Sequence, residues 1–307
     1  YKKYNILIVG GFMKHITVKP FVKWVGGKSQ LLNDIRAKYP EKIDKYCEPF
    51  VGGGAVLLDI LANCHPKEVL INDINAELVN TYFQIKNNPN ELIEKLNNMQ
   101  NCFWNKNTDE RKVMYLSKRE RFNDLKVKGN EQVNIEKAAL FIFLNKTCFN
   151  GLYRVNRKGL FNVPMGAYKK PPICDADNLE CISKLLQNVQ INCGEYRECT
   201  EFIDKNTFVY IDPPYRPLTK TSSFTSYSEN EFGDKQQIEL GKFIDDISAK
   251  GAKIVASNSD PKNSDENDCF FDELYARYTI TRVSAKRMIN SNAFGRGNVN
   301  ELLICNY

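Results

Sequence analysis

The stretch TFVYIDPPYRPL, residues 207–218, decides how we interpret the fold. Its apolar run from Phe208 to Ile211 has the β-branched and aromatic side chains typical of a buried strand. Two prolines then end the strand, because neither has an N–H group to donate to a neighbouring strand. The Asp212 carboxylate and the Tyr215 ring are therefore expected just beyond a strand end. In open α/β sheets, ligands bind at that edge.

Strand and helix patterns alternate on both sides of a long helical region. Residues 76–146 read as helices throughout, and LYRVNRKGLFNVP (152–164) reads as a hairpin that turns at Gly159. This order predicts an α/β protein, a doubly wound and mostly parallel sheet interrupted by a second module. We assign residues 1–74 and 171–307 to the sheet domain and residues 75–170 to the helical insert. Strands are predicted at 45–48, 68–73, 189–193, 208–211, 252–258, 278–284 and 301–306, and further helices at 30–39, after the glycines of FVGGG (50–54) and around 231–250.

The composition is that of a soluble globular protein. The chain has 307 residues, of which 42% are hydrophobic and 26% charged, and it has no apolar run near the roughly 20 residues that span a bilayer. Ten scattered cysteines without C-x-x-C spacing, and two histidines, argue against a zinc site and for free thiols in a reducing cytosol. At the start, YNILIVGGF (4–12) is either a short strand or a non-native leader, with Met13 as a possible natural start.

Basic residues gather in two stretches that lack acids. Residues 146–170 hold six lysines and arginines, and residues 277–300 hold five, while the whole chain has a net charge of +6. Such stretches suit a polyanion such as DNA or RNA. The alternative is two solvated loops whose charge is balanced elsewhere.

Two glycine-rich segments suggest a site for a nucleoside cofactor. FVGGG lies between a strand and a helix, and Asp73 ends the next strand about 20 residues later, where an acid can accept hydrogen bonds from ribose hydroxyls. The spacing is not G-x-G-x-x-G, which disfavours NAD. Upstream, Trp24 and Lys28 flank Gly26 and Gly27 and offer an aromatic face and a cation. The alternatives are a tight turn for the glycines and a solvent-facing position for Lys28.

The Asp-Pro-Pro-Tyr turn has the groups to hold an exocyclic amine. The Asp212 carboxylate and the Pro213 carbonyl are two acceptors that would bind both hydrogens of an NH₂ group. Its lone pair would then be more available for attack, and Tyr215 could stack on the planar base. The alternative is a proline-rich strand exit with a capping aspartate.

Four motifs follow one another along the chain: KWVGGK (23–28), FVGGG, IND (71–73) and DPPY (212–215). With these motifs in this order, the chain resembles the Dam-like, group α, DNA adenine methyltransferases. The resemblance extends over FNGLYRVNRKGLFNVPMGAY (149–168) and SSFTSYSENEF (222–232) and covers nearly the whole chain after Lys19. It implies a Rossmann-like methyltransferase sheet with an inserted helical DNA-recognition domain. It also implies transfer of a methyl group from S-adenosylmethionine to N6 of a flipped adenine in duplex DNA, without metal.

The resemblance also implies roles for single residues. The adenine would be held by Asp212, Pro213 and Tyr215 of the catalytic Asp212-Pro213-Pro214-Tyr215 turn. The cofactor would be held by Trp24, Lys28, Phe50, Gly52, Gly53, Asp73, Tyr196 and Asp212; of these, Tyr196 stands where relatives often have phenylalanine. Arg154 is the candidate for a bidentate contact to guanine. The other expected DNA contacts are Phe149, Asn150, Leu152, Pro164, Tyr168, Arg287 and Arg296.

These implications define the function that we expect. The chain is a site-specific enzyme, acting within GATC as the modification half of a restriction–modification system, in the cytoplasm of a bacterium or phage-infected cell. It works as a monomer or weak dimer on DNA. One rival is a methyltransferase for another NH₂ group, on cytosine N4, an RNA base or a protein glutamine. The other is a catalytically dead DNA-binding protein on the same fold.

Overall fold

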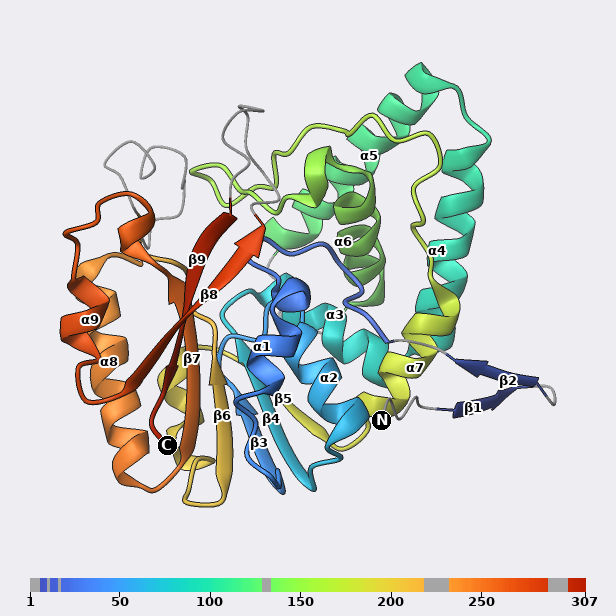
Figure 1. The fold of residues 1–307 in the computed structure, drawn as a ribbon. Coiled ribbons are helices and arrows are strands. Elements are labelled where there is room, and N and C mark those ends of the chain that lie inside the picture. Colours follow the sequence, from blue (N-terminus) through green and yellow to red (C-terminus); the bar gives the residue numbers. More distant parts are fainter. Residues whose placement is uncertain (1–5, 10–11, 16–17, 129–133, 218–231, 287–297) are drawn as a thin grey trace. The chain divides into compact units, whose positions relative to one another are not determined.

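The structure is a computed structural model that describes residues 6–9, 12–15, 18–128, 134–217, 232–286 and 298–307. Its main sheet has seven strands in the order β5-β4-β3-β6-β7-β9-β8. Helices flank the strands, which confirms the predicted α/β class (Figure 1). The strands are β3 (Lys45–Glu48), β4 (Glu68–Asp73), β5 (Val189–Cys193), β6 (Thr207–Ile211), β7 (Lys253–Ser259), β8 (Thr279–Lys286) and β9 (Asn298–Cys305).

The chain forms two compact units, each assembled from three separate segments. Unit 1 comprises residues 1–27, 52–63 and 73–194, and unit 2 comprises residues 28–51, 64–72 and 195–307. The predicted helical insert, 75–170, falls within unit 1. Its assignment as a DNA-recognition domain stays a prediction.

In unit 2, the strand order reverses between β3 and β6. Strand β3 pairs in parallel with β4 on one side and with β6 on the other, where Cys47 lies opposite Val209. In open sheets such a reversal is where ligands bind, at the carboxyl ends of the strands. Phe50 follows β3 and Asp212 follows β6, so both lie at this edge.

Antiparallel pairing completes the sheet of unit 2. Strand β9 lies between β7 and β8 and is antiparallel to both, with Glu301 opposite Ser259 and Val283. One face of the sheet packs on α8 (Asp234–Ala249), α9 (Phe270–Leu274) and the 3-10 helix η3 (Tyr196–Glu201). The two short helices η1 (Lys28–Gln30) and α1 (Leu32–Arg36) begin this unit. They are shorter than the helix predicted over residues 30–39.

Unit 1 is mainly helical and is organised around α6 (Ile135–Thr147). This helix is buried from Ala138 to Asn145, and α3 (Ala76–Asn87), α4 (Pro89–Trp104) and α5 (Thr108–Val127) pack against it. Its continuous apolar run from Ala138 to Leu144 explains that central position. Unit 1 also contains α2 (Ala55–Asn63), α7 (Ala176–Leu186) and the turn η2 (Phe149–Gly151).

Two short hairpins differ in detail from the sequence interpretation. At the start, β1 (Ile6–Val9) and β2 (Phe12–His15) pair antiparallel, where one short strand or a leader was expected. The hairpin predicted at 152–164 is present as a turn with one antiparallel bridge, Val155 to Phe161, and Gly159 has φ 71°. That left-handed conformation is why a glycine stands at the turn.

Candidate active site

The Asp212 carboxylate lies at the exit of β6 and is held from two sides. Its Oδ1 accepts hydrogen bonds from the Lys28 ammonium at 2.8 Å and from the Ser257 hydroxyl on β7 at 2.9 Å. The Tyr210 hydroxyl donates to the Ser257 oxygen at 3.1 Å and so orients it. Among the described residues, none hydrogen-bonds to the second oxygen, Oδ2. The side chain is 20% exposed, which leaves that oxygen an acceptor at the edge of the sheet.

Lys28 is not solvent-facing, and that alternative is wrong. Its side chain is only 3% exposed, and its ammonium lies 2.8 Å from Asp212 and 3.8 Å from Glu301. A buried ammonium needs nearby anions because burial removes its hydration. The pair therefore ties the short helix η1 to the Asp-Pro-Pro-Tyr turn within unit 2.

Tyr215 is fixed by its hydroxyl and by one ring face. The hydroxyl donates to Glu301 Oε2 at 2.5 Å, and the Lys28 ammonium lies 4.8 Å from the ring centroid. Burial raises the pKa of this phenol far above its usual value, and the Asp212 and Glu301 charges raise it further. The hydroxyl therefore stays protonated and donates.

The backbone carbonyls of Pro213 and Pro214 differ in their hydrogen bonding. Pro213 is buried, and no described residue hydrogen-bonds to its carbonyl oxygen. The Pro214 carbonyl accepts from Gln237 Nε2 at 3.1 Å, and Asn258 Nδ2 in turn donates to the amide oxygen of Gln237 at 3.1 Å. Gln237 and Asn258 are buried, so this chain of hydrogen bonds fixes the turn from behind.

Phe50 and Tyr196 form an aromatic pair at the carboxyl end of β3. Their rings are stacked at 5.2 Å between centroids, and Tyr196 is 8% exposed. Burial raises the pKa of the Tyr196 hydroxyl, while the neighbouring Arg197 charge lowers it. Flat aromatic groups of this kind can stack on a planar ring, and the cofactor role expected for both residues stays a prediction.

In unit 1, the glycine turn is held closed by Asp73. Its Oδ2 accepts from the Gly52 N–H at 2.9 Å and its Oδ1 from the Asn75 N–H at 2.9 Å. Burial raises the pKa of this carboxyl, and the backbone hydrogen bonds oppose the increase. Asp73 thus orders the loop, a role that our sequence interpretation did not assign to it.

Trp24 packs directly on the same turn. A Cβ atom added to Gly52 would lie 2.9 Å from the indole Cδ1, and one added to Gly53 would lie 3.0 Å from the Trp24 Cβ. The indole also stacks on Tyr153 at 5.9 Å. Three predicted cofactor residues, Trp24, Gly52 and Gly53, therefore meet in unit 1.

The segment expected to contact DNA follows α6 in unit 1. Phe149, Asn150, Arg154 and Pro164 are exposed, and Leu152 and Tyr168 are half-buried. The Phe149 side chain is 52% exposed, so it does not pack in the core. Arg154 Nε donates to Asn162 Oδ1 at 2.8 Å, which steadies the base of its guanidinium. Arg287 and Arg296 lie outside the described residues.

Several residues in these constellations were missed by the sequence interpretation. Glu301, Ser257 and Gln237 contact the Asp-Pro-Pro-Tyr turn but lie in separate elements, and no short motif contains them. Lys23 is next to Trp24, and its ammonium lies 3.4 Å from the Tyr168 hydroxyl and 4.8 Å from that ring's centroid. The basic Lys-Trp pair of KWVGGK was the one signal that could have pointed to Lys23.

Comparison with known proteins identifies the family. Residues 24–289 match the D12 class N6 adenine-specific DNA methyltransferases. The chain belongs to this family. It is 48% identical over 296 residues to the type II methyltransferase M.MjaIII of Methanocaldococcus jannaschii, covering 94% of this chain and 99% of that protein. It is 37% identical over 294 residues to the type II methyltransferase M1.LlaDCHI of Lactococcus lactis, covering 95% and 96%. It is 35% identical over 294 residues to a DNA adenine methylase of Haemophilus influenzae, covering 95% and 93%.

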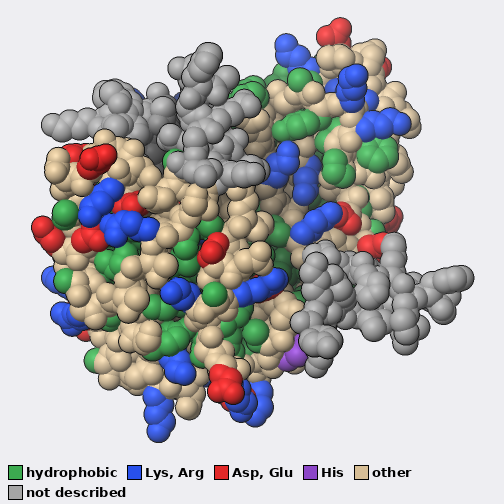
Figure 2. Space-filling view, in the orientation of Figure 1, with side chains coloured by type: hydrophobic (Ala, Val, Ile, Leu, Met, Phe, Trp, Pro, Cys, Tyr) green, Lys and Arg blue, Asp and Glu red, His purple; other side chains and the backbone are tan. Residues whose placement is uncertain are grey.

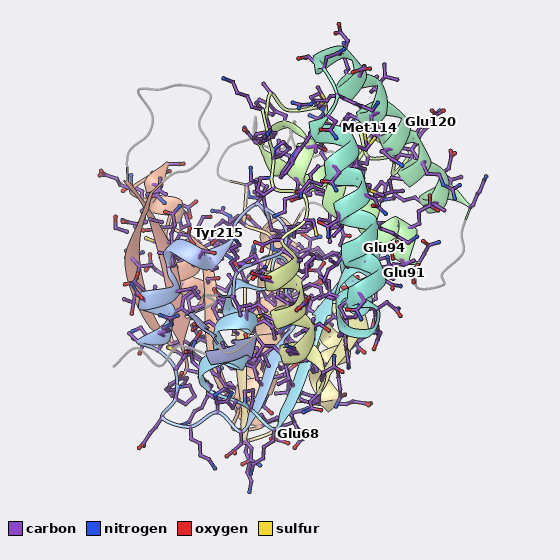
Figure 3. All side chains as sticks on the ribbon, turned by 90° about the vertical axis from the view of Figure 1, so that its right-hand side faces the viewer. Glu68, Glu91, Glu94, Met114, Glu120 and Tyr215 are labelled. Atoms are coloured by element: carbon purple, nitrogen blue, oxygen red, sulfur yellow. The ribbon has the colours of Figure 1, made fainter. Side chains whose placement is uncertain are left out.

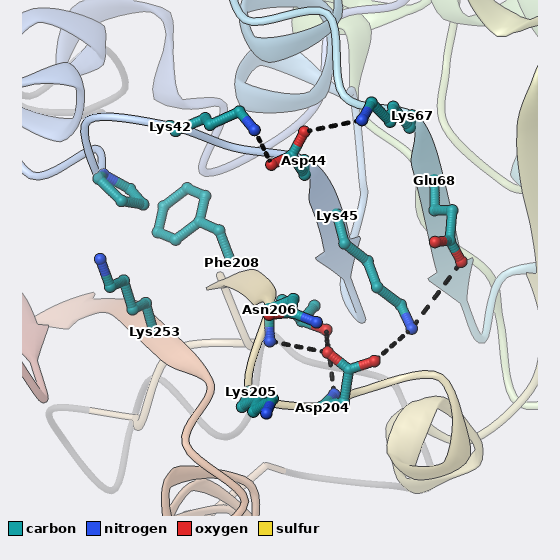
Figure 4. Close-up of a pocket in the computed structure, with 12 residues that line it drawn as sticks. Lys42, Asp44, Lys45, Lys67, Glu68, Asp204, Lys205, Asn206, Phe208 and Lys253 are labelled. Carbon is teal, nitrogen blue, oxygen red and sulfur yellow. Dashed lines mark hydrogen bonds and ion pairs between the residues drawn. The ribbon is translucent and has the colours of Figure 1, made fainter.

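One pocket of this methyltransferase lies away from the Asp-Pro-Pro-Tyr turn. It is in unit 2, where its lining includes the amino ends of strands, with Lys45 of β3 and Glu68 of β4 (Figure 4). Lys45 pairs with Asp204 at 2.8 Å, and Lys42 and Lys67 both pair with Asp44. Figure 3 shows Glu68 and Tyr215 at opposite ends of the sheet. Because these lysines already have carboxylate partners, we assign the pocket no part in methyl transfer.

Further features of the methyltransferase concern metals, membranes, thiols and charge. Within the described ranges, no group of three or more His, Cys, Asp or Glu side chains is arranged to hold a metal ion. Of the helices described, none is both long and apolar enough to cross a bilayer. All ten cysteines are free thiols. On the face drawn in Figure 2, basic and acidic side chains are intermixed.

Proposed function

We propose that this chain transfers a methyl group from S-adenosylmethionine to N6 of an adenine flipped out of duplex DNA, within GATC. The observation that carries the proposal is the pair of acceptors after β6. Asp212 Oδ1 is occupied by Lys28 and Ser257, whereas no described residue binds Oδ2 or the Pro213 carbonyl. Two acceptors next to each other in the chain match the two hydrogens of an exocyclic amine.

The chemistry follows from how those acceptors are held. An adenine NH₂ that donates to Asp212 Oδ2 and to the Pro213 carbonyl keeps its lone pair pointing away from both. Withdrawal of its hydrogens toward the acceptors makes the lone pair less delocalised into the ring. The Asp212 charge also stabilises the positive charge that develops on N6, and the preformed contacts from Lys28 and Ser257 mean that little reorganisation is needed. Extrusion of the base costs a few kcal/mol of stacking and pairing.

The cofactor residues predicted from the sequence fit the group. When bound, S-adenosylmethionine supplies an electrophilic methyl group on a sulfonium. In unit 1, Gly52 and Gly53 present bare backbone beside Trp24, and in unit 2 the stacked Phe50 and Tyr196 offer a flat apolar surface. The proposed cofactor-binding residues also include three charged ones: Lys28, Asp73 and Asp212.

DNA contact is supported by the exposed residues of unit 1. Phe149, Asn150, Arg154 and Pro164 have no buried packing role, and Lys23 adds a cation beside Tyr168. We propose that they read or grip the duplex, with the protein acting as a monomer or weak dimer in the cytoplasm. Two relatives named type II methyltransferases support a place in a restriction–modification system.

A methyl-transfer assay tests the proposal. The wild type and Asp212→Ala would be incubated with tritiated S-adenosylmethionine and two duplexes, one with GATC and one with that site scrambled. We expect N6-methyladenine in the GATC duplex alone, and a loss of at least about a hundredfold in Asp212→Ala, since an acceptor for developing charge is removed. Asp44→Ala, which changes a half-buried carboxylate at the other end of the sheet, is the control and should keep full activity.

Three other results of this assay would each exclude one part of the proposed function. Label in both duplexes would preserve the chemistry and exclude GATC specificity. Full activity of Asp212→Ala would exclude the acceptor role. No label from the wild type, together with tight duplex binding, would favour the catalytically dead DNA-binding protein.

A further inference from the structure

Glu301 belongs to no motif, yet it contacts two residues of the proposed site. It stands in β9 with its backbone paired to Ser259 and Val283, so the strand register fixes where its side chain starts. Its Oε2 accepts the Tyr215 hydroxyl at 2.5 Å and lies 3.8 Å from the Lys28 ammonium. The side chain is 19% exposed. A carboxylate buried to that degree is costly unless it has such partners.

Lys28 connects Glu301 to the catalytic turn. Its ammonium contacts Asp212 at 2.8 Å and lies over the Tyr215 ring at 4.8 Å from the centroid. A cation over a ring occupies one aromatic face. Since Lys28 covers one face of Tyr215, a base stacked on this ring would use the opposite face. Glu301 therefore restrains the ring at its hydroxyl, while Lys28 restrains the ring face and the Asp212 oxygen together.

We propose that Glu301 is a positioning residue for methyl transfer: it aligns the Tyr215 ring with the Asp212 carboxylate through the phenol hydroxyl and Lys28. The inference rests on the proposed function, because it assumes that Tyr215 stacks on the target adenine and that Asp212 accepts its amine. With the hydroxyl held, the ring cannot tilt independently of the acceptors. Small misplacements of reacting groups carry large rate costs, which is why such a remote contact matters.

A set of variants separates positioning from simple structural support. Glu301→Gln keeps an amide oxygen that can accept the Tyr215 hydroxyl but loses the charge next to Lys28, whereas Glu301→Leu loses both. Tyr215→Phe removes the hydroxyl and keeps the ring. Glu41→Gln, an exposed glutamate of the same unit, is the matched control. For each variant, kcat and KM would be measured on the cognate duplex, with rates normalised to titrated cofactor-binding sites and with Tm as a check of folding.

The expected result is a fall in kcat, with partial rescue by the conservative variant. A hydrogen bond to a charged group corresponds to a rate factor of about tenfold to a hundredfold, which we expect for Glu301→Leu. Glu301→Gln should retain more activity than Glu301→Leu. The double variant Tyr215→Phe with Glu301→Leu should be no slower than the slower single variant, because both changes break the same contact.

Three outcomes would overturn the inference. Wild-type kcat in Glu301→Leu would show that the contact does not position the ring. Additive losses in the double variant would show that Glu301 acts independently of Tyr215. An inactive wild type would remove the proposed function and the inference together, whereas either of the first two results leaves the proposed function intact.

Discussion

The buried pair of Lys28 and Asp212 dominates the electrostatics of single residues in unit 2. Removal of one member leaves the other charge buried without its nearest partner, which typically costs about 3–5 kcal/mol. Because Glu301 remains 3.8 Å from Lys28, we expect Asp212→Ala to lower the unfolding free energy by about 3 kcal/mol, the low end of that range. Denaturant unfolding measures this change.

Neutralising the lysine as well should reverse part of the loss. In Asp212→Ala combined with Lys28→Met, no ammonium is left without its nearest anion, and Glu301 keeps the Tyr215 hydroxyl as a partner, so the double variant should be more stable than Asp212→Ala alone. Equal stability of these two proteins would mean that the Lys28 charge is not buried as the structure has it. Both variants should show at least the roughly hundredfold loss of methyl transfer that we expect for Asp212→Ala.

Sequence reasoning located Asp212 and Tyr215 but not the residues around them. The prolines mark the strand exit within one short stretch, so that signal is local. Glu301 is 86 positions from Tyr215, and only the pairing of β9 with β7 places the two side chains in contact. The burial of Lys28 likewise depends on partners supplied by distant strands. Local patterns do not contain these contacts.

At the scale of elements, the glycine turn before α2 combines two constraints on its backbone. Gly52 has φ 48°, and an added Cβ would also lie 2.9 Å from the Trp24 indole. Gly159, in the hairpin, has φ 71° but nothing within 4 Å of an added Cβ. We expect Gly159→Ala to cost about 1–2 kcal/mol from backbone strain alone. Gly52→Ala should cost more and should also weaken S-adenosylmethionine binding.

Thermal unfolding of the Gly52→Ala and Gly159→Ala variants measures their loss of stability. Titration calorimetry measures their affinity for S-adenosylmethionine. Unchanged cofactor affinity in Gly52→Ala would place the cofactor away from the turn. An equal loss of affinity in Gly159→Ala would mean that general destabilisation explains the effect.

The hairpin of unit 1 is the element expected to read sequence. Arg154→Ala should reduce discrimination at the recognised guanine by about 1–3 kcal/mol, the value of one bidentate contact. Cofactor affinity should stay unchanged. The measurement compares kcat/KM on the cognate duplex with kcat/KM on a duplex that has one substituted guanine. Arg157→Ala, an exposed arginine at the turn of the same hairpin, is the control and should alter discrimination little.

The sequence predicts most of the helices and strands, but it does not predict the order of the strands in the sheet. Strands β3 and β4 have the predicted bounds, because turn residues flank each short run and leave it too short for a helix. The helix predicted at 30–39 is shorter in the structure, where η1 and α1 divide it. The position of β9 between β7 and β8 was not predictable, since strand order depends on long-range packing.

At the scale of the whole molecule, each unit is built from segments far apart in the chain. Strand β6 is buried along its whole length and pairs with β3, which precedes it by about 160 residues. A fragment of residues 195–307 would therefore expose β6 as an unpaired apolar edge. We expect this fragment to show no cooperative unfolding by circular dichroism. Mixing it with residues 1–194, which supply β3 and β4, should restore methyl transfer, and a cooperative transition in the fragment alone would contradict this view.

The position of β9 between β7 and β8 also has a consequence during protein synthesis. Strand β9 separates β7 from β8 and contributes Glu301. When only the residues up to 286 have left the ribosome, the sheet therefore lacks β9, and the Tyr215 hydroxyl lacks its acceptor, the Glu301 carboxylate. If the proposed function holds, a polypeptide at that stage lacks the contact that positions Tyr215 and should not methylate DNA. In this view, competence for methylation arises in one late step, when the strand Asn298–Cys305 leaves the exit tunnel and inserts between its two neighbours.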